Sequence, residues 1–298
     1  MKIEDIKQVA VIGAGAMGAQ IAQLLSQVGG ISVNITDVNE EAINKGIAFI
    51  KNGLQKYFVD KGKMTADDMS RIMGRIKGVA SQTECVKGAD FVIEAAFENM
   101  DVKKGIFRQL DKDTGPDIIL ASNSSNLNTS EIASVTGKPE KVVGMHFFNP
   151  VAVMKLVEIV RGPLTTDEAV NVTFELCKKI NKEPVVCKDF SFGFLANRAY
   201  WAMALEAVQM VWERVASPEE IDKALRLGYN LPMGPLELED FTGAWALTAA
   251  SEQDAMREMG PEKGKLHPLI RMMVRAGYPG GQGKKGIYDF YRDVLSKS

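Results

Sequence analysis

A histidine and a glutamate in neighbouring apolar segments are the residues best suited to catalysis. His146 closes one such segment, and Glu158 lies inside the next. An imidazole suits proton transfer near neutral pH, and a carboxylate within an apolar strand needs a partner. Together they would form a general base, the carboxylate fixing the histidine tautomer. A histidine satisfied by local hydrogen bonds and an edge-strand glutamate facing water remain the alternatives.

The sequence also carries a phosphate-binding pattern near its start. Gly13, Gly15 and Gly18 form G-x-G-x-x-G directly after an apolar segment, with Ala16 and Met17 inside the motif. Glycines there allow a tight turn, close approach of the backbone to a pyrophosphate, and close packing of helix on sheet. A glycine-rich turn that binds nothing is the alternative interpretation.

Asp37 follows the second predicted strand, where the carboxylate of a dinucleotide-binding fold is expected. Its oxygens can accept hydrogen bonds from both hydroxyls of a ribose, and its charge would repel a 2′-phosphate. The sequence therefore predicts NAD rather than NADP as the cofactor. FAD and NADP remain minor alternatives.

These residues require an alternation of strands and helices. Apolar strands are expected at 8–12, 31–36, 91–95, 118–121, 142–146, 154–160 and 183–187. Helices are expected from the glycine motif to about 28, and at 39–60, 100–112, 129–135 and 166–181. Thr65 with Asp68 predicts the start of one more helix, which makes an inserted helix pair. The fold class is therefore α/β, a Rossmann-type doubly wound sheet with an inserted helix pair.

After Asp189 the pattern changes to long stretches with helical periodicity, at 193–215 and 217–227. We expect residues 1–190 to form the nucleotide-binding domain and residues 191–298 an all-helical domain. The apolar residues of the first long stretch exceed what one small helical layer needs to bury, which favours a homodimer. His267 precedes Pro268 and is interpreted as a residue at the entry to a helix.

Composition narrows the functional classes. The chain has 298 residues, 46% of them hydrophobic and 25% charged, with a net charge of −2. That balance is typical of a globular protein and gives no reason to expect nucleic acid or a membrane as partner. Three scattered cysteines favour reduced thiols, a cytoplasmic location and no metal site.

Several motifs, in order, resemble those of the 3-hydroxyacyl-CoA dehydrogenases, especially the short members acting on 3-hydroxybutyryl-CoA. They are the glycine motif, Glu94-Ala95-Ala96-Phe97-Glu98, Ala121-Ser122-Asn123-Ser124-Ser125, His146-Phe147-Phe148-Asn149-Pro150, Gly193-Phe194-Leu195-Ala196-Asn197-Arg198, Met233-Gly234-Pro235 and Gly286-Ile287-Tyr288. The resemblance spans almost the whole chain. It implies reversible NAD-dependent oxidation of a short-chain (S)-3-hydroxyacyl-CoA.

The resemblance also implies a role for each matching residue. His146 would be the general base, Glu158 its orienting partner, and Ser125 and Asn197 hydrogen-bond donors to the substrate oxygens. The nicotinamide half of the cofactor would be lined by Glu98, Lys103, Asn123 and Asn149. Lys56, on the inserted helices, would contact the phosphates of CoA, although both lysines would otherwise be interpreted as solvated surface residues.

The chain departs from the family pattern at Asn126, at Phe192 and in the segment Gly280-Gly281-Gln282-Gly283-Lys284-Lys285, and its stretch between His146 and Asn197 is one residue longer than is common. At Gln282 the family usually has a lysine that contacts the cofactor, so that role is not transferred. These departures leave two alternatives open. One is a related dehydrogenase of a non-CoA hydroxy acid such as gulonate or carnitine, and the other is a catalytically silent NAD-binding protein of the crystallin type.

Overall fold

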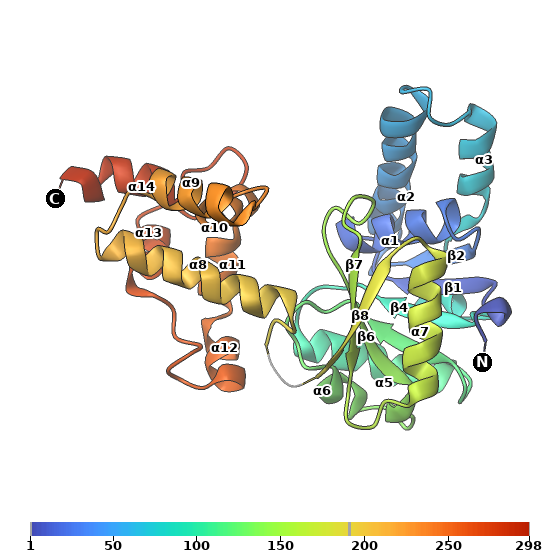
Figure 1. Cartoon of the computed structure of the whole chain (residues 1–298). Coiled ribbons are helices and arrows are strands. Elements are labelled where there is room, and N and C mark those ends of the chain that lie inside the picture. Colours follow the sequence, from blue (N-terminus) through green and yellow to red (C-terminus); the bar gives the residue numbers. More distant parts are fainter. Residues whose placement is uncertain (1, 190–191, 298) are drawn as a thin grey trace. The chain divides into compact units, whose positions relative to one another are not determined.

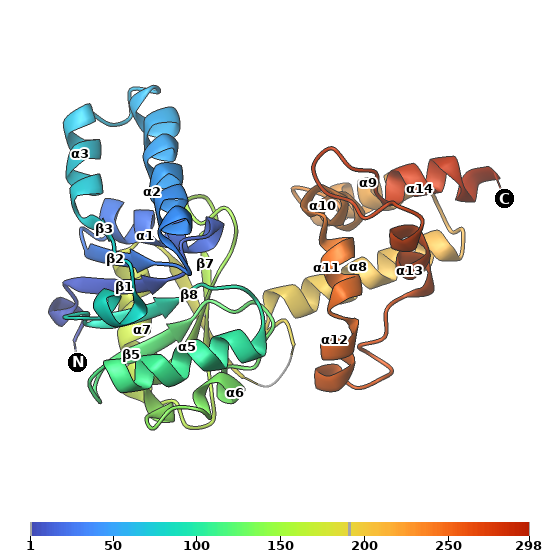
Figure 2. The same ribbon diagram turned by 180° about the vertical axis from the view of Figure 1, so that it is seen from behind.

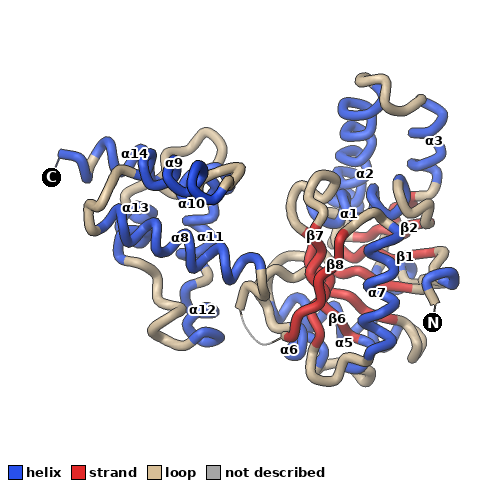
Figure 3. Tube along the Cα trace, in the orientation of Figure 1, coloured by secondary structure: helices blue, strands red, loops and turns tan. Residues whose placement is uncertain are grey.

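The computed structural model describes residues 2–189 and 192–297 (Figure 1). The chain divides into two compact units, Met1–Phe190 and Ser191–Ser298. The first unit contains an eight-stranded sheet, and the described part of the second is helical (Figure 3). This architecture confirms the predicted fold class.

The sheet has the strand order β3-β2-β1-β4-β5-β6-β7-β8. Its strands are β1 (Gln8–Ile12), β2 (Ser32–Thr36), β3 (Ile76–Gly78), β4 (Phe91–Glu94), β5 (Ile119–Ser122), β6 (Val142–Phe147), β7 (Leu156–Arg161) and β8 (Glu183–Lys188). The first six strands of this order are parallel, and β7 pairs antiparallel to β6. The carboxyl ends of these six strands therefore meet at one edge, where such sheets bind their ligands.

Helices cover both faces of the sheet. One face packs against α1 (Ala16–Gln27), α2 (Glu40–Leu54), α3 (Ala66–Gly74) and α7 (Asp167–Lys179), and the other against α4 (Gln82–Cys85), α5 (Met100–Asp113) and α6 (Thr129–Ala133). Figure 1 views the sheet from the side of α7, and Figure 2 views it from the side of α5. The apolar side chains of the strands alternate between two cores, as the two-residue period of a strand requires.

The predicted helix at 39–60 is interrupted. It is α-helical as α2 and continues as η2 (Gln55–Val59), a turn with π-helical hydrogen bonding. Thr65 caps α3 together with Asp68, as its sequence predicts. Strand β3 and helix α4 were not predicted, because elements of three and four residues are too short to show a period. The predicted strand at 154–160 begins later, at Leu156.

The second unit is built around a long helix. Its elements are α8 (Ala196–Trp212), α9 (Pro218–Tyr229), α10 (Pro235–Thr242), α11 (Ala244–Ala250), α12 (Glu252–Met259), α13 (Pro268–Arg275), α14 (Ile287–Asp293) and η4 (Leu295–Lys297). Trp245, Phe290, Leu236 and the inner side of α8 form its core. Among the described residues, no helix is long and apolar enough to span a lipid bilayer.

His267 lies at the start of helix α13, as the sequence predicted. Its Nδ1 accepts the backbone N–H of Leu269 at 3.1 Å, which caps α13, and its Nε2 contacts Gln209 Oε1 at 2.8 Å. A ring that accepts at Nδ1 and donates at Nε2 is the neutral tautomer. Burial lowers the pKa of His267 and favours the same form.

Glu239 on α10 is a buried acid with an incomplete set of partners. Its side chain is 5% exposed, and its Oε2 has no hydrogen-bond partner among the described residues. Burial, reinforced by the charge of Asp240, raises the pKa of Glu239 to about 7. The folded chain therefore favours the protonated form, and the stability this contributes is lost as the pH rises toward and through 7.

We expect the free energy of unfolding of the second unit to fall by about 3 kcal/mol between pH 5 and pH 8 because of this group. Glu239→Gln, which cannot ionise, should remove that part of the slope. Tryptophan fluorescence during urea unfolding is the measurement, since Trp201, Trp212 and Trp245 all lie in the second unit. Glu206→Gln, at an exposed position of α8, is the matched control. The same slope in wild type and Glu239→Gln would refute the assignment.

Candidate functional site

The glycine motif lies at the carboxyl edge of the sheet, between β1 and α1. Gly13 has φ +108°, and a Cβ there would lie 2.6 Å from the carbonyl oxygen of Ala95. A Cβ on Gly18 would lie 1.9 Å from the carbonyl oxygen of Gly13. Only glycine fits at these two positions, so the loop closes tightly against its neighbours.

Gly15 differs from the other two because it borders open space. It is exposed, and a Cβ built there would meet nothing within 4 Å. Gly15 is the N-cap of α1, and no side chain caps that helix. An uncapped helix N-terminus beside open space suits an anion, so this part of the chain fits a pyrophosphate.

Asp37 is tied to this loop. Its Oδ2 accepts the backbone N–H of Ala14 at 2.6 Å, and its Oδ1 accepts that of Val38 at 2.7 Å. The two bonds fix the carboxylate at the end of β2, one strand away from the glycines. Each oxygen keeps further acceptor capacity for a ribose hydroxyl.

His146 and Glu158 form a buried pair. They are directly opposite in the antiparallel pairing of β6 with β7, and His146 Nδ1 lies 2.8 Å from Glu158 Oε2. His146 is 3% exposed and Glu158 is fully buried. The ring of Phe148 lies 4.5 Å from that of His146, measured between centroids. The sequence predicted the partnership, and the register of the two strands explains it.

A second polar network links the ends of β4 and β5. Glu94 is fully buried. Its Oε1 accepts hydrogen bonds from Lys103 Nζ and from the backbone N–H of Ala96, both at 2.7 Å. Its Oε2 accepts a hydrogen bond from the Ser122 hydroxyl at 2.7 Å. Lys103 is 1% exposed and also lies 3.3 Å from Glu98 Oε2. The amine therefore faces two carboxylates and a backbone carbonyl.

Glu98 organises the loop that carries Ser125. Its Oε1 accepts the Ser124 hydroxyl at 2.6 Å and the backbone N–H groups of Ser125 and Asn126 at 2.9 and 3.1 Å. Desolvation raises the pKa of Glu98, but the charge of Lys103 and these hydrogen bonds outweigh it, so the pKa is lowered overall. Glu98 is therefore ionised at neutral pH.

Asn123 connects this loop to β6, the strand that carries His146. Its side-chain Oδ1 accepts the N–H of Phe147 at 2.9 Å, and its own N–H donates to the carbonyl of Glu94 at 2.7 Å. Because a backbone N–H can only donate, the amide orientation of Asn123 is determined. Its NH₂ group is turned away from β6.

The strands place the polar residues of this edge on one face. Glu94, Ser122, His146 and Glu158 alternate with residues of the core beneath α1 and α7, so their side chains project toward α5 and α6. Glu94 and Ser122 were not predicted to take part. The acid of Glu94 inside an apolar strand is the same signal that singled out Glu158, and it could have been recognised.

Three predicted residues lie apart from these networks. Lys56 is exposed on η2, and its Nζ lies 5.3 Å from the centre of the Tyr57 ring. Asn149 is exposed after β6, where its Oδ1 accepts from Gln20. Asn197 is the second residue of α8 and belongs to the second unit, so the structure leaves its expected role as a prediction.

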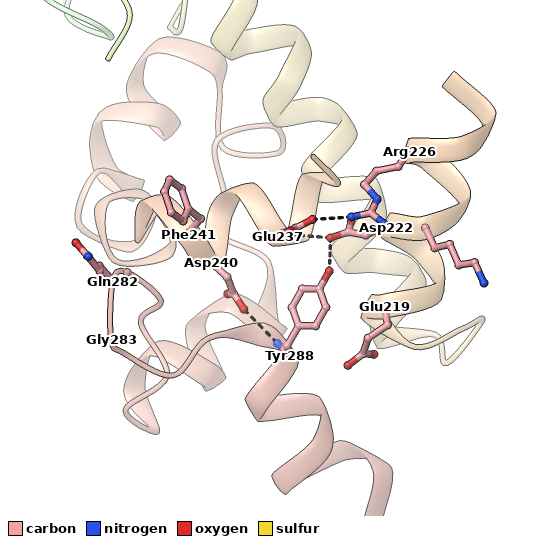
Figure 4. A pocket seen from close by; sticks show the side chains of 11 residues that line it. Glu219, Asp222, Arg226, Glu237, Asp240, Phe241, Gln282, Gly283 and Tyr288 are labelled. Carbon is pink, nitrogen blue, oxygen red and sulfur yellow. Dashed lines mark hydrogen bonds and ion pairs between the residues drawn. The ribbon is translucent and has the colours of Figure 1, made fainter. Parts of the chain in front are cut away.

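A pocket of about 600 Å³ lies in the second unit, and none of its described lining residues was predicted to bind cofactor or substrate. Figure 4 shows its lining, in which Asp222, Asp240 and Tyr288 take part in hydrogen bonds. Asp222 accepts two N–H groups at the start of α10 and the Tyr288 hydroxyl, and Asp240 accepts two at the start of α14. These carboxylates cap helices, which is a structural role.

The three thiols do not add chemistry. Burial raises the pKa of Cys85 and Cys177 to about 12, and that of Cys187 to about 11. All three are protonated near neutral pH, and only a thiolate is a good nucleophile or metal ligand.

Two family models match this chain in succession. The NAD-binding domain of 3-hydroxyacyl-CoA dehydrogenase matches residues 8–190, and the C-terminal domain of the same enzyme matches residues 193–290. The chain belongs to the 3-hydroxyacyl-CoA dehydrogenase family. It is accordingly an NAD-dependent oxidoreductase, which confirms the predicted cofactor and enzyme class.

Relatives match over nearly the full length. A probable 3-hydroxybutyryl-CoA dehydrogenase of Bacillus subtilis is 42% identical, with 96% of this chain and 98% of the relative covered. A 3-hydroxybutyryl-CoA dehydrogenase of Clostridioides difficile is also 42% identical, with 95% of this chain and 99% of the relative covered. The crystal structure of (S)-3-hydroxybutyryl-CoA dehydrogenase from Ralstonia eutropha is 38% identical and covers 95% of this chain and 98% of its own, with a TM-score of 0.88.

Proposed function

We propose that this dehydrogenase interconverts a short-chain (S)-3-hydroxyacyl-CoA, such as 3-hydroxybutyryl-CoA, and the 3-ketoacyl-CoA. The observation that carries the proposal is the buried His146–Glu158 pair, joined at 2.8 Å. His146 lies on β6 and Glu158 on β7, and β6 pairs with β5, whose Ser122 belongs to the polar network around Glu94. The names of the similar proteins support a four-carbon acyl group.

In the proposed mechanism, Glu158 receives the Nδ1–H of His146, so that Nε2 is the ring nitrogen that takes the proton of the 3-hydroxyl group. Bound NAD supplies the hydride acceptor. Glu158 also stabilises the imidazolium that forms, because its charge lies beside the ring and both side chains are buried. In the reverse direction the protonated His146 returns the proton. Ser125 and Asn197 would hold the substrate oxygen, as the family resemblance implies.

The cofactor would be held by the glycine motif and by Asp37, with Asn123 and Asn149 toward the nicotinamide. Lys103 would act through Glu98, since its amine is buried between carboxylates and is not presented to a ligand. Lys56 remains the candidate for the phosphates of CoA, because it is an exposed cation on the inserted helices.

The test is a panel of 3-ketoacyl-CoAs of increasing chain length, assayed with NADH and with NADPH. We expect the highest kcat/KM for acetoacetyl-CoA with NADH. With NADPH it should be lower by roughly 100-fold, because the Asp37 carboxylate repels the 2′-phosphate. A maximum at long chains, or with free gulonate or carnitine derivatives, would contradict the proposal. Turnover near ~1 per second excludes a silent binding protein.

We also propose that the protein is a cytoplasmic homodimer formed through the second unit. Large apolar side chains are exposed there, with Leu227, Tyr229 and Leu247 each at least 70% exposed. Large apolar side chains exposed in this way favour association with a partner that covers them. Light scattering at working concentration tests the dimer, and a monomeric mass would refute it.

A further inference from the structure

Gln20 joins the phosphate-binding helix to the segment that follows the catalytic strand. It lies on α1, just after the glycine motif, and is half-buried. Its Oε1 accepts the backbone N–H of Val151 at 2.9 Å. Its Nε2 donates to the carbonyl of Ala16 at 3.0 Å and to Asn149 Oδ1 at 3.2 Å. One side-chain amide thus connects the start of α1 to the segment after β6, which is remote in sequence.

The backbone determines how this amide is oriented. The N–H of Val151 can only donate, so the atom that faces it is the oxygen of Gln20. The carbonyl of Ala16 can only accept, so the atom that faces it is the nitrogen. Two independent backbone groups therefore select the same rotamer of the Gln20 amide, which is otherwise ambiguous in a structure.

This orientation is passed on to Asn149. Because Gln20 presents an N–H, the atom of Asn149 that faces it is Oδ1, and the NH₂ group of Asn149 is turned the other way. Asn149 is exposed, so that NH₂ group is available to a ligand. The side chain therefore offers donors, not an acceptor, at the cofactor edge.

We propose that Gln20 is a positioning residue that determines which end of the Asn149 amide faces the cofactor. The inference rests on the proposed function, in which Asn149 lines the nicotinamide half. A donor from Asn149 suits a hydrogen-bond acceptor of that half, such as the carboxamide oxygen of nicotinamide. With the opposite orientation, two acceptors would face each other and the bond would be lost.

Gln20→Glu separates this role from a purely structural one. The carboxylate of the variant still accepts the N–H of Val151, so the connection after β6 remains held. It has no N–H to offer, so Asn149 turns its NH₂ group toward the variant and presents Oδ1 to the cofactor. If Gln20 only anchors the connection, this variant should behave as wild type.

The experiment measures the dissociation constant of NADH by its fluorescence, and KM and kcat with acetoacetyl-CoA. Wild type, Gln20→Glu, Asn149→Ala and the double variant are compared. We expect Gln20→Glu to weaken NADH binding roughly tenfold. It should raise KM for NADH, leave KM for acetoacetyl-CoA unchanged, and add no further loss to Asn149→Ala. Gln27→Glu, the same change farther along α1, is the matched control and should bind as wild type.

Two outcomes would overturn the inference. One is wild-type NADH binding by Gln20→Glu, and the other is an equal loss with and without the Asn149 side chain, which would indicate charge repulsion of the phosphates. Failure of the proposed function is recognised separately, because the wild type itself would then not oxidise NADH with acetoacetyl-CoA. The NADH titrations would still decide the role of Gln20.

Discussion

In the His146→Gln variant, turnover of acetoacetyl-CoA should fall by about 10³-fold while the dissociation constant of NADH stays within about twofold of wild type. Glutamine retains an N–H that can donate to Glu158, so the buried carboxylate keeps a partner and the fold is preserved. It cannot take up a proton near neutral pH, so the base is lost. Steady-state kinetics with an NADH fluorescence titration are the measurement.

The decisive comparison is between the loss of turnover and the unchanged dissociation constant of NADH. The glycine motif and Asp37 lie on β1 and β2 and their loops, away from β6 in the sheet. The contacts that hold Asn123 and Asn149 involve the backbone of Phe147 and the side chain of Gln20, not the ring of His146, so NADH binding should be retained. Unchanged turnover would remove His146 from the mechanism. An equal loss of turnover and NADH binding would instead point to a disturbed fold, which the unfolding midpoint would reveal.

The Glu158→Gln variant should lose about 10²-fold in kcat with little change in KM for NADH. The amide oxygen of the variant can still accept the Nδ1–H of neutral His146, so the ground state is largely preserved. It cannot stabilise the imidazolium, so the loss falls on the transition state and appears in kcat. Glu175→Gln, at an exposed position of α7, is the matched control.

The two variants should not be additive. Because Glu158 is proposed to act through His146, the double variant is expected to be no slower than His146→Gln alone. A product of the two single effects would mean that Glu158 assists catalysis by a route that does not involve His146.

The sequence predicted the fold well where buried strands alternate with amphipathic helices, because burial on both faces leaves apolar runs that are easy to recognise. It placed both His146 and Glu158 in strands but could not determine the register that sets them opposite each other. Register depends on pairing between segments, which a one-dimensional pattern does not contain.

The same reason explains what was missed. Gln20 meets Asn149 across 129 residues of sequence, and neither position belongs to a local pattern that signals the other. Lys103 looked like a surface residue without the resemblance, since lysine on a helix usually is. Its burial becomes clear only when Glu94 and Glu98 are seen on the adjoining strand and loop.

The antiparallel pairing of β6 with β7 also bears on how such an enzyme can change during evolution. Val157 and Ile159, on either side of Glu158, are buried on the opposite face of the sheet. A shift of the pairing by one residue would move these apolar side chains to the wrong face, so burial fixes the register that sets Glu158 opposite His146. Residues added to or deleted from the connection between the strands would therefore change the surroundings of Asn149 without separating His146 from Glu158. The contacts around Asn149 can change through insertions at this connection while the pairing of the two buried side chains is retained.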